Sequence, residues 1–402
     1  MVRKVNQYCF PRYNVFELKV ILFHSFKSIA KSNIKEQYFY IFLLLKYLVM
    51  KKLAIVFLVL QVMLACFSCS RDAEKIIGIK IYEYGGDFNL LIDKWKEMGI
   101  NTAFVSIELA TDTIFRQLLK ENNIQVYIIF PVFYDPERLQ QDSTLYAITD
   151  KGKIARDDWV EFVCPSRTAF RKLKVDEAAD LIRTLEPDGL SIDFIRQFVF
   201  WEMIYPERTA ESIDIACFCD SCVGSFCKLE GITLPDTSIA VAQKAAYILN
   251  SYSERWNEYR CDLITSMIKE ISDKARGIKP DVKINVHAVP WRDEDFGGAN
   301  IRVAAQDLQK VAPFTDYISP MCYSQMLRRD ADWIGSVVTE MDKKAKGKIL
   351  PSIQVYPYYV DDPFTVEDFR ECIDAALKAP SQGVVFFSWP LFEKDPVRME
   401  IR

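Results

Sequence analysis

Acidic, amide and aromatic side chains recur at the ends of short apolar runs in this chain. Asp193 ends the run that follows Asp188-Gly189 in EPDGLSIDF, and a polar and aromatic segment comes directly after it. Parallel strands that are buried on both faces read as short apolar runs, and barrel enzymes gather their chemistry at the C-terminal ends of such strands. We therefore predict that Asp193 presents a carboxylate to a cleft. The alternatives are that it caps the next element or pairs with Arg196.

The other predicted strand ends carry a similar set of side chains. Carboxylates and amides hydrogen-bond hydroxyl groups, and aromatic faces can cover the apolar face of a sugar ring, so the set suits a neutral polyhydroxylated ligand. No glycine-rich phosphate loop accompanies it. His287 could donate to a sugar hydroxyl or orient Asp193, or be a satisfied core histidine. The predicted ligand-binding residues are Glu83, Glu108, Tyr134, Arg196, His287, Trp291, Tyr323, Gln354, Tyr356 and Trp389.

Eight strand-like runs alternate with helical patterns after residue 75. Strands that alternate with helices form a parallel sheet, and eight such units predict an α/β fold of the (β/α)₈ TIM-barrel type over residues 76–395. The longest insertion, from about 205 to 281, follows the fourth strand and holds a cysteine-rich turn and a helical stretch over 239–277. The predicted strands are 76–82, 102–108, 125–130, 189–194, 283–289, 316–323, 348–356 and 383–389.

Four segments in this order, DGLSIDFIR, DYISPMCY, ILPSIQVYPYY and GVVFFSW, resemble the glycosyl-hydrolase-like TIM barrels of bacterial lipoproteins. The resemblance implies a glycoside hydrolase that acts on an oligo- or polysaccharide. In similar α-amylase-like barrels the aspartate that ends strand four is the nucleophile, and Asp193 matches it. Chitinase-like barrels carry a glutamate where this chain has Ile195, which argues against their substrate-assisted chemistry.

Glycoside hydrolysis uses two carboxyl groups, about 5–5.5 Å apart for retention and further apart for inversion. With Asp193 as nucleophile or general base, the resemblance to amylase-like barrels makes Glu294, after strand five, the predicted acid, together with its neighbour Asp293. Glu202 is a second candidate that could simply face water. The alternative function is a non-catalytic glycan-binding protein that has lost its acid, and a structural envelope protein with a vestigial barrel is a third.

Four cysteines lie within eleven residues of the insertion. Their spacing could close round a structural zinc ion, and in an exported protein the same thiols could form disulfides. Either arrangement would staple the loop after strand four. The activity itself requires no cofactor. The four are Cys217, Cys219, Cys222 and Cys227; Cys164, Cys261, Cys322 and Cys372 are predicted to be buried singly.

The N-terminal region reads as a secretory signal. From Met50, a Lys-Lys start, an apolar run and small residues lead to a cysteine, as in bacterial lipoprotein signals. We predict a signal peptide over 50–69, lipidated at Cys69, with Cys66 as the competing site, and a linker over 70–75. Residues 1–49 are interpreted as a non-native upstream extension. The expected location is the cell envelope, with a lipid anchor in what is expected to be the outer membrane.

The overall charge balance argues against a nucleic-acid partner. The 402 residues include 51 Lys and Arg against 55 Asp and Glu, a formal net charge of −4. Proteins that bind nucleic acid favour a basic stripe. The expected partners are therefore a carbohydrate and, through the lipid, a membrane.

Overall fold

The computed structural model describes residues 33–67, 75–234, 236 and 238–400. Two compact units are present, Met1–Glu74 and Lys75–Arg402. In the first unit, α2 (Ile34–Phe67) runs without a break across the predicted start of the signal peptide at Met50. No helix among the described residues is long and apolar enough to cross a membrane. Cys69, the predicted lipidation site, lies outside the described residues.

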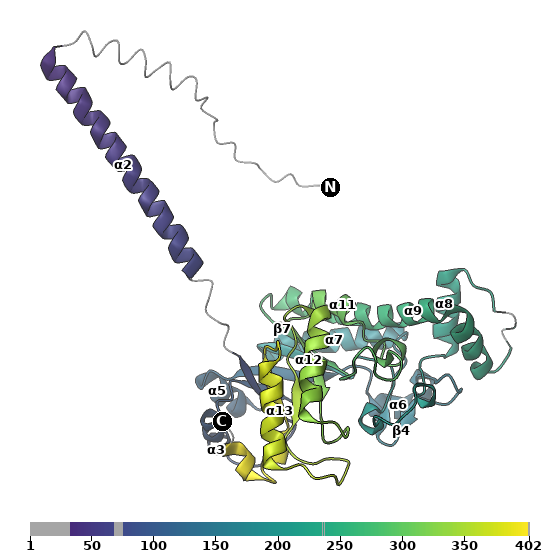
Figure 1. The fold of residues 1–402 in the computed structure, drawn as a ribbon. Coiled ribbons are helices and arrows are strands. Elements are labelled where there is room, and N and C mark those ends of the chain that lie inside the picture. Colours follow the sequence, from purple (N-terminus) through teal and green to yellow (C-terminus); the bar gives the residue numbers. More distant parts are fainter. Residues whose placement is uncertain (1–32, 68–74, 235, 237, 401–402) are drawn as a thin grey trace. The chain divides into compact units, whose positions relative to one another are not determined.

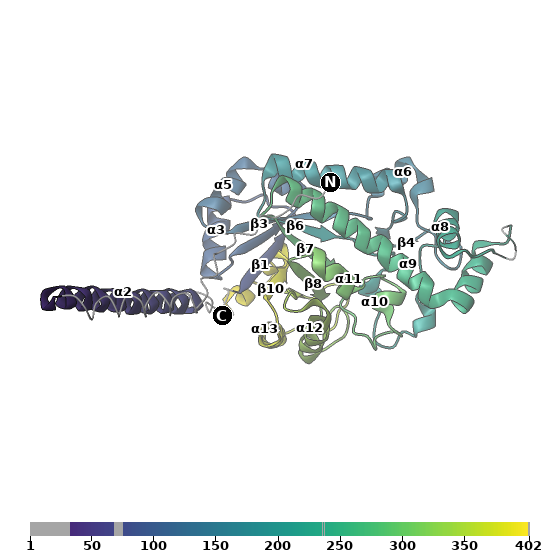
Figure 2. The same ribbon diagram turned by 90° about the horizontal axis from the view of Figure 1, so that it is seen from above.

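The second unit is built on a closed parallel barrel of eight strands (Figures 1 and 2), which confirms the predicted fold. Consecutive barrel strands are neighbours, and the last strand pairs with the first to close the ring. Every predicted strand is present, most of them shorter than predicted by one to six residues. The strands are β1 (Ile76–Ile81), β2 (Thr102–Val105), β3 (Gln125–Pro131), β6 (Gly189–Asp193), β7 (Lys283–Ala288), β8 (Tyr317–Cys322), β9 (Ser352–Gln354) and β10 (Gly383–Phe387).

Helices surround the strands, and the far end of α9 projects to one side together with α8 (Figure 2). Several helices start at an aspartate whose side chain accepts a backbone N–H of the first turn, as Asp112 and Asp330 do. The helices of this unit are α3 (Phe88–Glu97), α4 (Ile107–Ala110), α5 (Thr113–Glu121), α6 (Pro136–Gln141), α7 (Thr168–Leu185), α8 (Asp220–Glu230), α9 (Val241–Ile278), α10 (Ala299–Arg302), α11 (Leu308–Val311), α12 (Ala331–Ala345), α13 (Val366–Lys378) and α14 (Trp389–Phe392). Short 3₁₀ turns are η1 (Ser143–Leu145), η2 (Trp201–Met203), η3 (Ala210–Ser212), η4 (Ala312–Phe314) and η5 (Pro396–Glu400).

Large apolar side chains fill part of the barrel interior. Side chains alternate along a strand, so every second residue of each barrel strand faces the axis. Phe104 and Tyr127 pack together with ring centroids 5.0 Å apart and ring planes tilted by 37°, in a small cluster separate from the main core. A Cβ at Gly189 would lie 2.3 Å from the Tyr127 ring, so this glycine makes room for the aromatic plug. Asp188 beside it accepts the Val126 N–H at 2.8 Å, which gives the Asp-Gly pair of the motif a structural role.

Two long excursions leave the C-terminal side of the barrel and contact each other. Residues 132–167 hold the hairpin of β4 (Arg156–Asp157) and β5 (Val160–Glu161), and residues 194–240 lead into α9. The Phe218 N–H donates to the Ile148 carbonyl at 2.7 Å, and a bridge joins Thr149 to Ala216. The buried guanidinium of Arg260 donates to the Ala216 carbonyl at 2.6 Å and ties the second excursion to α9. The two excursions therefore form one wall beside the barrel mouth.

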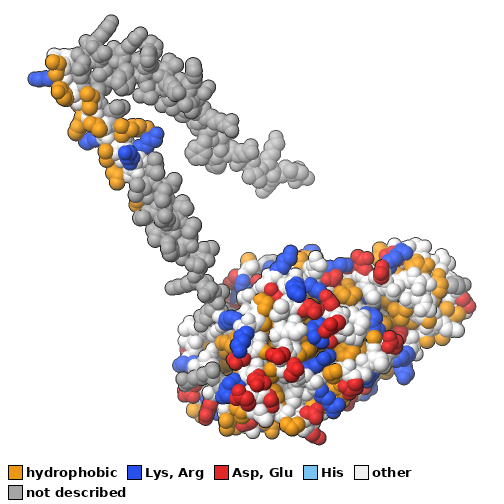
Figure 3. All heavy atoms as spheres, viewed as in Figure 1, with side chains coloured by type: hydrophobic (Ala, Val, Ile, Leu, Met, Phe, Trp, Pro, Cys, Tyr) orange, Lys and Arg blue, Asp and Glu red, His pale blue; other side chains and the backbone are white. Residues whose placement is uncertain are grey.

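The surface of this unit carries both signs of charge. On the face that Figure 3 shows, Lys and Arg side chains are interspersed with Asp and Glu side chains. This mixed surface agrees with the near balance of basic and acidic residues in the sequence.

Candidate active site at the barrel mouth

A cavity of about 780 Å³ opens at the C-terminal ends of the strands. Its charged lining groups are Lys80, Glu108, Asp193, Arg196, Glu202 and Lys394, and its aromatic lining groups are Tyr82, Tyr134, Trp159, Phe194, Trp201, Tyr323, Tyr358, Tyr359 and Phe387. These residues come from strands β1, β6 and β10 and from the segments that follow β1, β2, β3, β6, β8, β9 and β10. The cavity thus combines aromatic walls with a few carboxylates and cations.

Asp193 ends β6 with its carboxylate at the cavity and its side chain only 13% exposed. One oxygen accepts the Phe194 N–H at 2.7 Å, and the other lies 3.9 Å from Nδ1 of His287. Burial raises the pKa of Asp193, but His287, Lys80, the Phe194 N–H and Arg196 outweigh it and hold the pKa below its usual range. Asp193 is therefore ionised at neutral pH.

Glu202 is a second carboxyl of the cavity, and it is buried. It sits in η2, its exposed fraction is 8%, and none of the described protein groups hydrogen-bonds its Oε2. Burial raises its pKa to about 7, with a further upward contribution from Asp193 and an opposing one from Arg196. The loop after β6 is held against the segment that follows α10, because the Gln197 N–H donates to the Ala304 carbonyl at 2.9 Å. Two carboxyls in one cavity thus have pKa values displaced in opposite directions, the pattern that separates an acid from a base.

Stacked aromatic rings form the walls. Tyr134 stacks on Phe194 with ring centroids 4.6 Å apart, and Tyr323 stacks on Phe387 at 4.7 Å. Trp159, in the β4–β5 hairpin, stands edge-on to Tyr134 at 5.8 Å. Rigid aromatic faces of this kind bind the apolar face of a ring while leaving its hydroxyls free for polar partners.

The structure brings together five of the predicted site residues at the cavity, Glu108, Tyr134, Asp193, Arg196 and Tyr323. His287 is buried beneath them, next to Asp193. Five others lie outside the cavity lining: Glu83, Trp291, Gln354, Tyr356 and Trp389. Gln354 has structural partners instead, because it accepts the Met326 N–H and donates to Gln325, both at 2.9 Å. Trp389 is fully buried and packs edge-on against Trp95 at 5.9 Å.

Glu294, the predicted acid, also lies outside the cavity lining. Its side chain is 72% exposed and pairs with Arg292 at 2.9 Å. Its neighbour Asp293 pairs with Lys344. This position therefore lacks the burial that encloses Glu202 in the cavity. Glu202, the second candidate in the sequence, is the carboxyl that the fold buries in the cavity.

Lys80 was not among the site residues predicted from the sequence, although its place in an apolar strand could have revealed it. In the strand IIGIKI it is the one charged residue, and it occupies an inward position. Burial lowers the pKa of Lys80 to about 8, partly offset by Asp193. A lysine inside an otherwise apolar barrel strand is the feature that could have identified it.

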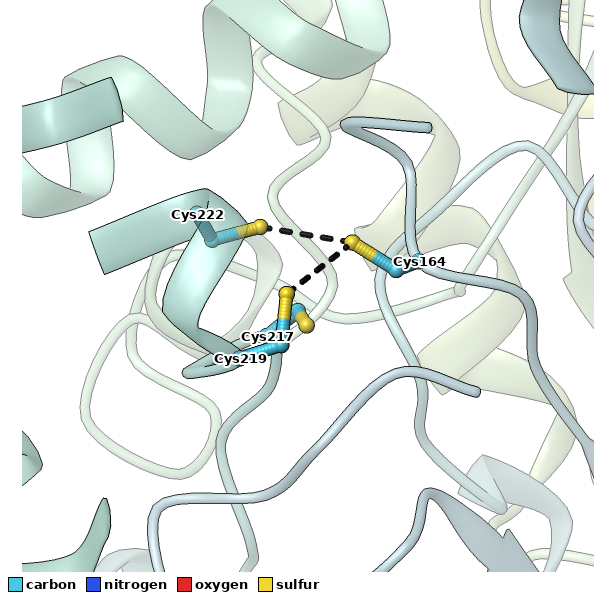
Figure 4. A group of neighbouring side chains, drawn as sticks. All are labelled: Cys164, Cys217, Cys219 and Cys222. Atoms are coloured by element: carbon cyan, nitrogen blue, oxygen red, sulfur yellow. Dashed lines mark hydrogen bonds between the residues drawn. The ribbon is translucent and has the colours of Figure 1, made fainter. Parts of the chain in front are cut away.

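The cysteine cluster differs from its prediction in one member (Figure 4). The Sγ atoms of Cys164, Cys217, Cys219 and Cys222 all lie within 4.8 Å of one another, and all four residues are buried. Sγ of Cys164 lies 3.4 Å from Sγ of Cys222 and 3.5 Å from Sγ of Cys219. Cys227 is a free, half-buried thiol outside this group, because it lies further along α8. The prediction was therefore wrong in including Cys227 and in treating Cys164 as a buried single.

The fold is shared with solved glycoside hydrolases. No protein-family model matches this chain, and no curated protein matches it in sequence. Its structural neighbours are sugar-cleaving enzymes. The glycoside hydrolase domain of PgaB (BpsB) from Bordetella bronchiseptica superposes with a TM-score of 0.60 at 11% identity, over 81% of this chain and 97% of that domain.

Two β-galactosidases are similar over about half of their length. The enzyme from Marinomonas ef1 has a TM-score of 0.58 at 11% identity, over 78% of this chain and 54% of that one. The enzyme from Rahnella sp. R3 has a TM-score of 0.58 at 14% identity, over 80% of this chain and 51% of that one. At these identities the similarity establishes the shared barrel fold.

Proposed function

We propose that this protein is a glycoside hydrolase that cleaves an oligo- or polysaccharide at the barrel mouth. The observation that carries the proposal is the pair of carboxyls, the largely buried Asp193 and the buried Glu202, in one aromatic-walled cavity with pKa values displaced in opposite directions. The barrel fold shared with solved glycoside hydrolases supports the same reaction class.

In this mechanism Glu202 is the general acid. A carboxyl with a pKa of about 7 still holds its proton in near-neutral solution, and it donates that proton to the glycosidic oxygen as the bond to the anomeric carbon breaks. Asp193, ionised, stabilises the positive charge that develops at that carbon. It then acts as the nucleophile of a retaining reaction or as the base that activates water in an inverting one.

The proposal is tested by a hydrolysis screen of the purified protein against a panel of polysaccharides and aryl glycosides. Asp193→Asn is the paired variant, because the amide has the same shape without the charge. We expect turnover by the parent and its loss in the variant at an unchanged melting temperature. Binding without cleavage by the parent would contradict the enzyme proposal and support a glycan-binding protein. A variant that unfolds would assign Asp193 a structural role.

We further propose that the four-cysteine cluster holds a structural zinc ion. The donor set fits: a tetrahedral zinc with Zn–S bonds of about 2.3 Å keeps its sulfurs about 3.8 Å apart, and Cys164 is nearly equidistant from two partners rather than aligned with one. Hydrogen bonds from the neighbouring thiols lower the pKa of Cys219, whereas burial raises the pKa of Cys217 and hydrogen bonds from the other thiols raise the pKa of Cys222. Elemental analysis of the purified protein should give one zinc per chain, and its absence together with the loss of four free thiols would support disulfides.

We also propose that the chain is an envelope lipoprotein anchored through Cys69. The support is the sequence pattern from Met50 onward and the exposed apolar side chains of α2, such as Leu53 and Phe57. In a bacterial host the protein should fractionate with membranes and shift to the soluble fraction in a Cys69→Ala variant. Unchanged fractionation of Cys69→Ala, with a shift on Cys66→Ala, would move the anchor to Cys66.

A further inference from the structure

Lys80 is a buried cation in a part of the barrel where branched apolar residues usually pack. It occupies β1 with 1% of its surface exposed, and it is one of the residues that line the cavity. Burying an ammonium group is costly unless other groups compensate, so such a residue in a barrel interior calls for a functional reason.

The ammonium donates two hydrogen bonds to uncharged groups. Nζ lies 3.2 Å from Nδ1 of His287 and 3.1 Å from the phenolic oxygen of Tyr323. Among the described residues it forms no ion pair, and the negative charge that acts on it is that of Asp193. The titratable groups that face it are therefore His287 on β7, Tyr323 directly after β8 and Asp193 on β6.

These contacts fix the protonation of His287. An ammonium has no acceptor, so Nδ1 of the imidazole must be unprotonated and accept from Lys80. The imidazole proton then sits on Nε2 and donates to Oγ of Ser191 at 2.8 Å. Ser191 also accepts from Asn285 at 2.9 Å, and Asn285 in turn accepts from Ser319 at 2.9 Å. The chain of hydrogen bonds crosses four barrel strands and leaves the imidazole one orientation.

This arrangement leaves one oxygen of Asp193 without a hydrogen bond from the imidazole. Nδ1 of His287 lies 3.9 Å from Oδ2 of Asp193, and it carries no proton in this tautomer. If the Lys80 charge were removed, Nδ1 could take a proton and donate it toward Asp193. That contact would occupy the lone pairs that the proposed nucleophile or base must use.

We propose that Lys80 is a positioning residue that holds the proton of the neutral His287 on Nε2 and keeps Asp193 ionised with its reactive oxygen free. The inference rests on the proposed hydrolase mechanism for its consequence, but its physical basis is independent of any substrate. A residue that serves only to pack the barrel interior would set neither the imidazole proton nor the charge of Asp193.

The first test is the protonation of His287 in the parent protein. The chain has two histidines, His24 and His287, so ¹⁵N-histidine labelling in a His24→Gln background leaves one imidazole to observe. We expect a neutral ring with its proton on Nε2 between neutral pH and about pH 3, because burial lowers the pKa of His287 to about 3. A ring protonated on Nδ1, or doubly protonated at neutral pH, overturns the proposal without any change to Lys80.

The second test replaces the charge. Lys80→Met keeps the stem without the cation, and Lys80→Arg keeps a cation. In Lys80→Met we expect a proton on Nδ1 and a higher pKa of His287, since the charge of Lys80 opposes and that of Asp193 favours imidazolium. Its kcat/KM should fall about 100-fold, a typical effect of losing one preorganised charge, at an equal or higher melting temperature. Lys80→Arg should restore the parent tautomer and part of the activity.

These outcomes separate this proposal from the proposed function. An unchanged tautomer and an unchanged pKa of His287 in Lys80→Met would give Lys80 a packing role only, even if the protein is a hydrolase. If the parent cleaves no glycan, the hydrolase proposal fails. The ¹⁵N nuclear magnetic resonance measurement still decides whether Lys80 sets the tautomer of His287.

Discussion

The indole N–H of Trp159 donates a hydrogen bond of 2.6 Å to the phenolic oxygen of Tyr359, a residue 200 positions further along the chain. The bond joins the β4–β5 hairpin to the loop after β9, and both residues line the cavity. Phe200 packs edge-on against both rings, at 5.8 Å from Trp159 and 5.9 Å from Tyr359. The three rings therefore connect two loops beside the two carboxyls, as a binding wall rather than as reacting groups.

Trp159→Ala should weaken substrate binding more than it slows the reaction. Loss of one aromatic contact corresponds to about a tenfold rise in KM, with kcat within about threefold of the parent because the indole contacts no reacting atom. Trp159→Phe keeps the ring contacts without the hydrogen bond and should show a smaller effect. Steady-state kinetics check the expectation, and an equal loss in kcat and kcat/KM would instead place Trp159 in the transition state.

Glu202→Gln should lose the acid but keep the cavity. We expect kcat on an unactivated glycoside to fall by about 10²–10⁴-fold, the usual contribution of a positioned acid. Aryl glycosides with a strongly acidic leaving group need no proton and should be affected far less. Activity of the parent should decline as pH rises through about 7, where Glu202 loses its proton, and the variant should lack that limb.

Glu294→Gln provides the matched control for this experiment. Its carboxylate is exposed and pairs with Arg292 outside the cavity lining, so the variant should retain the activity and the pH profile of the parent. If Glu294→Gln instead loses activity toward unactivated substrates only, and Glu202→Gln does not, the acid lies on the loop after β7 as the sequence first indicated.

The same carboxyl should make stability depend on pH. The pKa of Glu202 rises from an ordinary value of 4.5 to about 7 on folding, so the folded state keeps a proton that the unfolded chain has released. The resulting stability is fully present below about pH 4.5 and is lost as pH rises through about 7, by on the order of 3 kcal/mol. Denaturant unfolding of the parent and of Glu202→Gln across this range isolates the effect as their difference. Parallel curves would mean that water reaches the carboxyl.

The barrel could be predicted from the sequence because each strand is a local pattern. An apolar run such as GLSIDF, followed by a helical period, encodes its own element, and eight of them specify closure. Asp193 was predicted for the same reason, since a strand end is a local feature. Glu202 could not be distinguished from Glu294 in this way, because its burial depends on how the loop after β6 folds back, through contacts such as Gln197 with Ala304.

Positions set by long-range contacts account for the other differences. Gln354 and Trp389 sit at strand ends, as predicted, but hydrogen bonding and packing turn them away from the cavity. Cys164 lies 53 residues before the cysteine-rich turn, and only the contact between the two excursions brings it to Cys217. Spacing in the sequence placed Cys227 in the predicted cluster, because it is close to the other three cysteines of the turn. It lies on a helix that carries it away from their thiols.

Cys164→Ser and Cys227→Ser should therefore behave differently. Cys164 joins the excursion that carries Trp159 to the excursion that carries Glu202, so its loss should release the proposed zinc ion, lower the melting temperature and reduce activity through the wall that the two excursions form. Cys227→Ser should keep the metal, the melting temperature and the activity. A strong chelator should reproduce the Cys164→Ser result in the parent, since structural zinc contributes directly to folding. Equal effects of the two serine variants, with no metal in the parent, would mean that the cluster is held by disulfides or by packing alone.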